Sequence, residues 1–275
     1  MFATRFAPSP TGYLHRGHAY SALTAFAAAQ DAGGRFVLRI EDIDATRCRP
    51  EFEVGIHEDL AWLGLSWEQP VRRQSEHRDD YQAALARLEA EGLLYRCFRT
   101  RKEVAEAMVS APHGAMEVFR GAALPPDEEA RRLAAGGPFA WRLSLDAASR
   151  TLGGFGGLTF TEEGEGVVSA RPELGGDVVL ARKDVGVAYH LAVTVDDALQ
   201  GITHVIRGRD LFEATHVQRL LQALLGLPEP IYRHHALLTG PDGKRYAKRD
   251  HAETLRSLRE RGMSAAELRK ELGFE

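Results

Sequence analysis

The stretch that decides the fold lies at the start of the chain, where residues 5–18 read RFAPSPTGYLHRGH. Residues 2–7 predict a short buried strand, and the run PSPTG at residues 8–12 ends it, because closely spaced prolines sustain neither helix nor sheet. Residues 19–30 are rich in alanine, leucine and phenylalanine and predict a helix that Gly33 and Gly34 close. Residues 36–40 predict a second strand. This succession is typical of a βαβ unit in a parallel sheet.

The remaining segments extend this pattern with one long interruption. Apolar residues at helical spacing predict helices over residues 51–63, 78–91 and 211–225. A high content of β-branched residues predicts strands over residues 178–180, 188–195 and 203–207, and a last strand is expected over residues 231–238. Residues 95–174 hold several Gly-Gly pairs and one Pro-Pro pair, and their periodicity is poor. We therefore expect an inserted subdomain with irregular connections there.

Composition excludes several classes of protein. The chain has 275 residues, 35 Lys+Arg against 39 Asp+Glu, and 44% hydrophobic residues, as in an ordinary globular protein. No apolar run approaches the ~20 residues of a membrane-spanning helix, and the N-terminus lacks the features of a signal peptide. The two cysteines, Cys48 and Cys97, exclude a disulfide framework and a four-thiolate metal site. A cytoplasmic protein without a membrane partner is expected.

Charge is distributed unevenly along the chain. Residues 244–261 contain seven basic and three acidic residues, a balance of +4, so the rest sums to −8 within the net charge of −4. A basic patch on an acidic body is compatible with a phosphate-rich partner such as a nucleic acid, although a solvated helix face is the commoner explanation. Charge alone leaves both interpretations open.

Two short segments carry candidate chemistry. HRGH at residues 15–18 follows the proline loop at the start of the predicted helix, where two imidazoles and free backbone N–H groups can bind phosphate oxygens. Gly17 would let a nucleotide approach the backbone closely. KRYAKR at residues 244–249 follows a glycine turn, and mobile cations there suit a departing pyrophosphate. Taken alone, the second segment is equally compatible with a solvated charged loop.

Together with GGRFVLRIEDID (33–44) and HVIRGRDL (204–211), these segments resemble, in order and spacing, the catalytic domain of class I glutamyl-tRNA synthetases, from about Arg5 to Asp250. The resemblance implies an α/β fold: a Rossmann-like parallel sheet, an inserted α+β subdomain and a short helical C-terminus. It also implies a division into domains. Residues 1–94 and 178–238 would form the two halves of the catalytic domain, and residues 95–177 an inserted acceptor-type subdomain. Residues 239–275 would form a basic loop with C-terminal helices, with no anticodon-binding domain.

The resemblance also assigns the site residues. His15, His18 and Lys248 would be catalytic, and Gly17 and Arg245 would join them in binding ATP. Arg16 stands where an apolar residue is usual, so we expect its stem to pack and its charge to reach solvent. HRGH matches the family's first signature, and KRYAKR matches its second signature, KMSKS: Lys248 matches the second lysine, Arg245 replaces the first and Ala247 replaces a serine. Glu41 would take the substrate ammonium, and two arginines suit a γ-carboxylate. The expected glutamate-binding residues are Arg5, Phe6, Ala7, Pro8, Ser9, Glu41, Tyr189 and Arg207.

Two departures indicate a branch of this family. Residues 250–275 are all that follows the basic segment, too few for the helical anticodon-binding region of synthetases that charge the 3′ end. In this respect, and in the run GHAYSALTAF, the chain is similar to the glutamyl-Q tRNA(Asp) synthetase branch, which attaches glutamate to queuosine in the anticodon. The implied partners are L-glutamate, ATP with Mg²⁺ and tRNA(Asp) bearing queuosine, with a monomer as the expected state. A minimal glutamyl-tRNA synthetase, another nucleotidyltransferase and a non-catalytic tRNA-binding paralogue stay open.

The second departure concerns a metal. In this branch a Cys-x-Cys pair and a later Tyr and Cys commonly bind zinc, whereas this chain keeps Cys97 but has Arg99 at the second position. No cysteine follows, and His113 is the other candidate ligand. Because zinc takes about four nitrogen or sulfur ligands, we expect no structural zinc, and we expect Cys97 to be a small buried hydrophobe.

Overall fold

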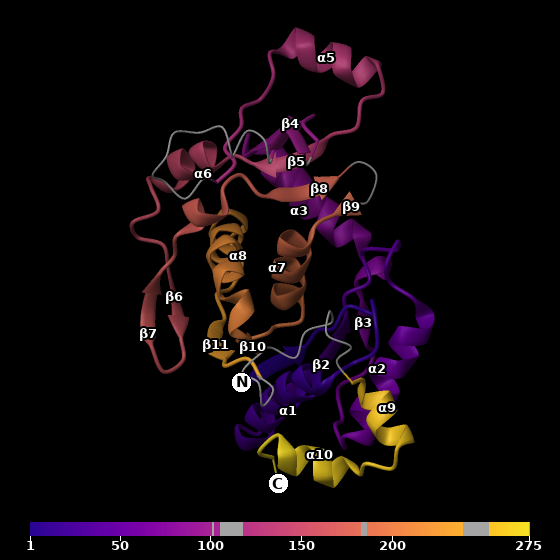
Figure 1. The fold of residues 1–275 in the computed structure, drawn as a ribbon. Coiled ribbons are helices and arrows are strands. Elements are labelled where there is room, and N and C mark those ends of the chain that lie inside the picture. The colour runs from indigo at the N-terminus through magenta and orange to yellow at the C-terminus, as the bar shows by residue number, and fades with distance from the viewer. Residues whose placement is uncertain (101, 105–117, 183–185, 239–252, 275) are drawn as a thin grey trace.

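The computed structural model describes residues 1–100, 102–104, 118–182, 186–238 and 253–274 (Figure 1). It confirms the opening βαβ unit. Strands β1 (Ala3–Phe6) and β2 (Arg35–Ile40) are parallel neighbours joined by helix α1 (Arg16–Asp31). The short strand β3 (Arg72–Arg73) continues the sheet beyond β2. The helix thus begins three residues before the predicted start, at the signature histidines.

The second half of the parallel layer lies on the other side of β1. Strand β10 (His204–Gly208) lies beside β1, where the backbone N–H of Thr203 donates to the carbonyl of Ala3 at 2.9 Å. Strand β11 (Ile231–His235) pairs in parallel with β10 and ends three residues before the predicted boundary. The carboxyl ends of these strands consequently open on one edge, which in a parallel sheet is where ligands bind.

Helices cover this layer close to the predicted positions. The elements are α2 (Pro50–Trp62), η1 (Gln74–Glu76), α3 (Arg78–Ala90), η3 (Arg209–Leu211) and α8 (Phe212–Leu225). Proline at the first position begins α2, and Gly226 in the left-handed region (φ 59°) ends α8.

The strand predicted over residues 188–195 is wrong, because these residues begin helix α7 (Tyr189–Leu199). The helix packs between α3 and α8, and Leu191 to Asp197 are all buried. A segment buried on every side shows no periodicity that separates helix from strand, so its β-branched residues were misleading. Thr194 fits the helix because its hydroxyl donates to the carbonyl of His190 at 2.8 Å.

The segment expected to be irregular contains short regular elements, which explains its poor periodicity. An antiparallel sheet contains β4 (Leu94–Cys97), β5 (Ala140–Leu143), β8 (Val179–Arg182) and β9 (Gly186–Val187) in that order. Helices α5 (Pro126–Ala134) and α6 (Leu145–Leu152) and the turn η2 (Pro172–Gly175) accompany it. The hairpin of β6 (Thr159–Glu162) and β7 (Gly166–Ser169) returns to the parallel layer, where Glu162 pairs with Tyr232 of β11. The domain boundaries at residues 94, 177 and 238 stay a prediction.

The short helical C-terminus lies against α1 and α2 (Figure 1). Helices α9 (Leu255–Glu260) and α10 (Ala265–Glu271) begin at the capping side chains of Thr254 and Ser264. Leu255, Leu258 and Leu268 are buried in the same apolar cluster as α1. In the described part of the chain, no helix combines the length and apolarity that a membrane crossing requires.

Candidate functional site

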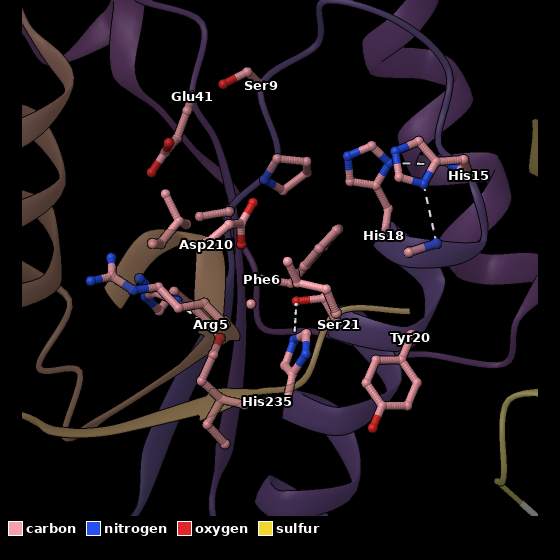
Figure 2. Close-up of a pocket in the computed structure, with 18 of the residues that line it drawn as sticks. Arg5, Phe6, Ser9, His15, His18, Tyr20, Ser21, Glu41, Asp210 and His235 are labelled. Carbon is pink, nitrogen blue, oxygen red and sulfur yellow. Dashed lines mark hydrogen bonds between the residues drawn. The ribbon is translucent and has the colours of Figure 1, made fainter. Parts of the chain in front are cut away.

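A cavity of about 560 Å³ opens at the carboxyl ends of β1, β2, β10 and β11, against the N-terminus of α1 (Figure 2). Arg5 and Glu41 lie on one side of it and the two signature histidines on the other. Arg245 and Lys248 lie outside the described residues. The cavity brings together the predicted residues Arg5, Phe6, Ala7, Pro8, Ser9, His15, Gly17, His18, Glu41, Tyr189 and Arg207.

The signature histidines form the N-terminal cap of α1. His15 Nδ1 accepts from the backbone N–H of Gly17 at 3.1 Å, and His18 Nδ1 accepts from the N–H of His15 at 3.2 Å. The two rings lie 3.8 Å apart. A neutral imidazole that accepts at Nδ1 carries its proton on Nε2. The cap therefore fixes both rings as Nε2 donors, which is the form that suits a phosphate oxygen.

Gly17 has a structural role that adds to the expected close approach of a nucleotide. A Cβ atom at this position would lie 3.0 Å from His15 Cε1 and 3.1 Å from His15 Nδ1. Both contacts are too short for an undisturbed ring. Glycine at position 17 consequently leaves the space that the His15 cap occupies.

Arg16 does not direct its charge to solvent as expected. Its Nη1 lies 2.9 Å from Glu253 and its Nη2 lies 3.2 Å from Glu271, and its side chain is 18% exposed. Both partners belong to the C-terminal segment. Arg16 therefore ties the signature helix to the chain that follows the basic segment.

Arg207 is a buried cation in the wall of the cavity. Its Nε donates to His234 Nε2 at 3.1 Å, its Nη2 donates to Thr215 and Gln218 at 2.8 Å each, and its Nη1 lies 3.4 Å from the hydroxyl of Tyr189. Burial raises the pKa of Tyr189, so the phenol stays neutral. Within the described residues, Arg207 forms no ion pair with a carboxylate. The wall thus offers a desolvated positive charge whose acceptors are all neutral.

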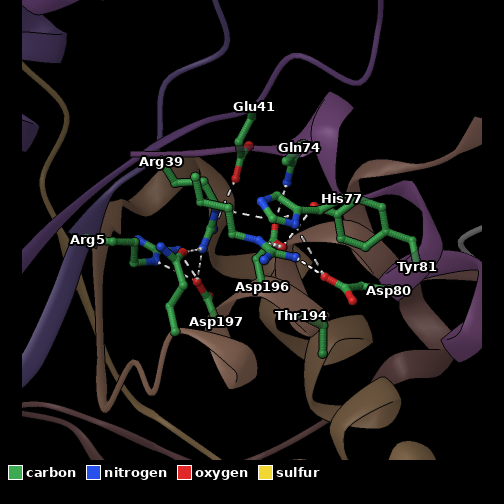
Figure 3. Close-up of polar contacts among 12 residues, drawn as sticks. Arg5, Arg39, Glu41, Gln74, His77, Asp80, Tyr81, Thr194, Asp196 and Asp197 are labelled. Atoms are coloured by element: carbon green, nitrogen blue, oxygen red, sulfur yellow. Dashed lines mark hydrogen bonds and ion pairs between the residues drawn. The ribbon is translucent and has the colours of Figure 1, made fainter. Parts of the chain in front are cut away.

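Glu41, the residue after β2, brings a negative charge to the cavity, opposite in sign to that of Arg207. Its side chain is 7% exposed and accepts from Arg39 Nη2 at 3.1 Å (Figure 3). Burial raises the pKa of Glu41, and the neighbouring Arg39 and Arg5 oppose that shift. Glu41 lines the cavity, so its carboxylate can meet a cationic group of a ligand.

Behind Glu41 lies a buried charge network that the sequence reasoning missed. Arg39 is fully buried and donates to Asp197 at 2.8 Å, and its Nε lies 3.6 Å from Asp196 (Figure 3). Asp197 also pairs with Arg5 at 3.1 Å; burial opposes ionisation of Asp197, but Arg5 and Arg39 together outweigh it and lower the pKa of Asp197. The sequence held a signal, since charged residues that interrupt otherwise buried segments imply buried partners. Arg5, in contrast to Arg207, therefore has its charge matched within the protein.

Cys97, the cysteine that the sequence keeps from the expected zinc motif, lies in apolar surroundings. Cys97 is 6% exposed and packs with Tyr95 and Phe119, which confirms it as a buried residue. His113 lies outside the described residues. Across the ranges that the structure describes, no three His, Cys, Asp or Glu side chains are grouped so as to hold a metal ion.

Comparisons with known proteins match this geometry. The model of the family described as tRNA synthetases class I (E and Q), catalytic domain, matches residues 1–272. The chain is 46% identical to the glutamyl-Q tRNA(Asp) synthetase of Rhodobacter capsulatus over 98% of this chain and 99% of that protein. It is 43% identical to the glutamyl-Q tRNA(Asp) synthetase of Symbiobacterium thermophilum, over 96% of this chain and 83% of that protein.

A solved structure agrees in fold. The crystal structure of a glutamate tRNA ligase from Elizabethkingia meningosepticum in complex with its amino acid superposes with a TM-score of 0.75 at 28% identity. The match covers 95% of this chain and 53% of that one, so the chain spans about half of the ligase's length. The signature helix, the parallel layer and these matches agree: the chain belongs to the catalytic-domain family of class I tRNA synthetases for glutamate and glutamine.

Proposed function

We propose that the protein activates L-glutamate with ATP, without tRNA, and transfers the glutamyl group to queuosine in the anticodon of tRNA(Asp). The observation that carries the amino-acid assignment is the pair of opposite charges in the cavity wall. Arg207, which has no carboxylate partner among the described residues, suits the γ-carboxylate, and Glu41 suits the ammonium group. A substrate with a neutral or shorter side chain would leave the desolvated charge of Arg207 without a counter-ion.

The activation step needs no protein nucleophile. An oxygen of the glutamate α-carboxylate attacks the α-phosphorus of ATP, and the bond to pyrophosphate breaks, giving glutamyl-adenylate. His15 and His18 would donate from Nε2 to the phosphate oxygens beside the N-terminus of α1, where the helix dipole favours negative charge. Mg²⁺ would enter with ATP as part of the substrate. Catalysis would then consist of positioning and charge stabilisation.

The basic segment would act on the departing group. We assign Lys248 to stabilise the pyrophosphate as it leaves, with Arg245 binding the phosphates beside it. The described chain supports this assignment at both flanks, since Leu238 lines the cavity and Thr254 forms a bridge with His15. Because residues on both sides of the basic segment lie at the cavity, the cations of that segment can reach the ATP site.

Transfer of the glutamyl group would involve a second cavity beside the first. A second cavity of about 370 Å³ shares Ser9, Glu41 and Tyr189 with the first. It suits an acceptor whose ring hydroxyl attacks the carbonyl carbon of glutamyl-adenylate and releases AMP. The Rhodobacter and Symbiobacterium relatives, both glutamyl-Q tRNA(Asp) synthetases, support queuosine in tRNA(Asp) as that acceptor. The Elizabethkingia protein, a glutamate tRNA ligase, supports a minimal glutamyl-tRNA synthetase as the second candidate.

The activation step is tested by pyrophosphate exchange with no tRNA present. We expect labelled pyrophosphate to enter ATP when L-glutamate is added, because the cavity already presents both charges. L-Glutamine, whose side-chain amide carries no charge, and L-aspartate, which is one methylene shorter, serve as controls and should support little exchange. A requirement for tRNA, or equal exchange with glutamine, would contradict the proposal.

A further inference from the structure

A chain of buried hydrogen bonds, here called the relay, joins Glu162 at the end of β6 through His234 to the Arg207 guanidinium. Glu162, the last residue of β6, accepts from the backbone N–H of His234 at 2.7 Å through Oε1, and its Oε2 lies 2.8 Å from His234 Nδ1. The side chains of His234 and Glu162 are 0% and 2% exposed. On the far side of the ring, Nε2 lies 3.1 Å from Arg207 Nε. The imidazole therefore bridges a carboxylate and a guanidinium.

The chemistry of these groups fixes the proton on the ring. A guanidinium N–H donates and never accepts, so His234 Nε2 must be the acceptor of the bond from Arg207. The ring is then neutral with its proton on Nδ1, and Nδ1–H donates to Glu162. Burial and the nearby Arg207 agree with this form, since they lower the pKa of His234 to about 3.

We propose that Glu162 is a positioning residue for amino-acid recognition: by holding the His234 proton on Nδ1, it keeps Nε2 as the acceptor that fixes the Arg207 guanidinium in the cavity wall. This inference rests on the proposed recognition of a γ-carboxylate by Arg207. The relay orients the guanidinium through a neutral ring. A carboxylate in direct contact would orient it too, but would neutralise the charge that a carboxylate substrate needs.

The relay also determines specificity between glutamate and glutamine. Thr215, Gln218 and the Tyr189 hydroxyl, the other acceptors of Arg207, are likewise uncharged. An anionic side chain therefore gains a charge-assisted pairing with Arg207 that an amide cannot match. Glu162, although it lies in the segment 95–177, thereby contributes to the discrimination made at the ends of β10 and β11.

Glu162→Gln is the matching test. The amide oxygen can still accept from the His234 backbone, but the NH₂ group then faces Nδ1 and makes that atom the acceptor. The ring proton moves to Nε2, where it opposes Arg207 Nε–H. We expect the KM for L-glutamate in pyrophosphate exchange to rise about 30-fold, the loss of one hydrogen bond to a charged group. The KM for ATP should not change, and discrimination against glutamine should fall.

A spectroscopic readout separates this role from a purely structural one. Long-range ¹H–¹⁵N correlation spectra report which ring nitrogen carries the proton, with His234 identified by its loss in His234→Asn. We expect the proton on Nδ1 in the wild type and on Nε2 in Glu162→Gln. The matched control is Glu163→Gln, at the next residue, where the carboxylate is half exposed and lies 3.7 Å from Arg233. That variant should keep the wild-type KM and tautomer.

Each outcome decides the inference. A wild-type proton on Nε2, or an unchanged glutamate KM in a Glu162→Gln protein whose tautomer has switched, would overturn it. If Glu162→Gln does not fold, the wild-type tautomer alone decides. If the wild type shows no exchange, the proposed function fails, and the Kd for L-glutamate from calorimetry in the two proteins still tests the relay.

Discussion

Arg207→Ala is expected to lower kcat/KM for glutamate in pyrophosphate exchange by about 10³-fold, since removing one partner of a buried charge pair costs 2–5 kcal/mol. Arg207 is 4% exposed and forms no ion pair among the described residues, so the substrate carboxylate would be its counter-ion. The loss should fall mainly on the KM for glutamate, because the interaction exists before the transition state. Steady-state exchange at varied glutamate and fixed ATP measures it.

The matched control for this prediction is Arg209→Ala, two residues along the chain. Arg209 is half exposed and pairs at 2.6 Å with Glu165, and it does not line the cavity. Exposed pairs of this kind contribute about 0–1 kcal/mol, so exchange and stability should stay near wild type. Unchanged exchange in Arg207→Ala, with Arg209→Ala equally unaffected, would show that the γ-carboxylate binds elsewhere.

Arg39→Met is expected to reduce the free energy of unfolding by about 3–5 kcal/mol, the usual cost of breaking a buried ion pair from one side. Arg39 is fully buried and lies against Glu41, Asp196 and Asp197. After the substitution Asp197 keeps Arg5 and Asp196 keeps Arg72, whereas Glu41 loses the hydrogen bond from Arg39. Urea unfolding followed by circular dichroism measures the change.

The pH dependence of this loss has a defined sign. In Arg39→Met the pKa of Glu41 in the folded state should rise further above its ordinary value, because burial persists without the opposing cation. Glu41 in the folded variant then binds a proton more readily than in the unfolded chain, so the loss of stability relative to the wild type should become smaller as the pH falls from 7.5 toward 5. The control, Arg35→Met on the same strand, removes an exposed pair with Glu68 and should cost less than about 1 kcal/mol. Equal losses in the two variants would contradict the role of Arg39.

The sequence predicted the parts of the site that local motifs determine. The proline loop after β1 and the histidines at the start of α1 follow directly from the βαβ pattern, whereas Glu41 at the end of β2 was assigned through the resemblance to the glutamyl-tRNA synthetase catalytic domain. Strand ends in a parallel sheet converge, so their residues could be expected in one cavity. The placement of Lys248 and Arg245, outside the described residues, stays a prediction.

The partners of these residues could not be predicted, because they depend on packing between distant segments. Arg5 and Asp197 are 192 positions apart, and Glu162 and His234 are 72 apart. The wrong strand over residues 188–195 has a related cause. Burial on every side of α7 removed the polar face that marks a helix, and with it the indication that Asp196 and Asp197 point into the core.

The most direct test of the proposed function uses labelled L-glutamate, ATP and two pools of tRNA, one from normal cells and one from cells that cannot make queuosine. We expect label to enter the normal pool and not the other, because the acceptor is a hydroxyl of the queuosine ring. Equal labelling of both pools would mean that glutamate is attached at the 3′ end, and would contradict transfer to the anticodon.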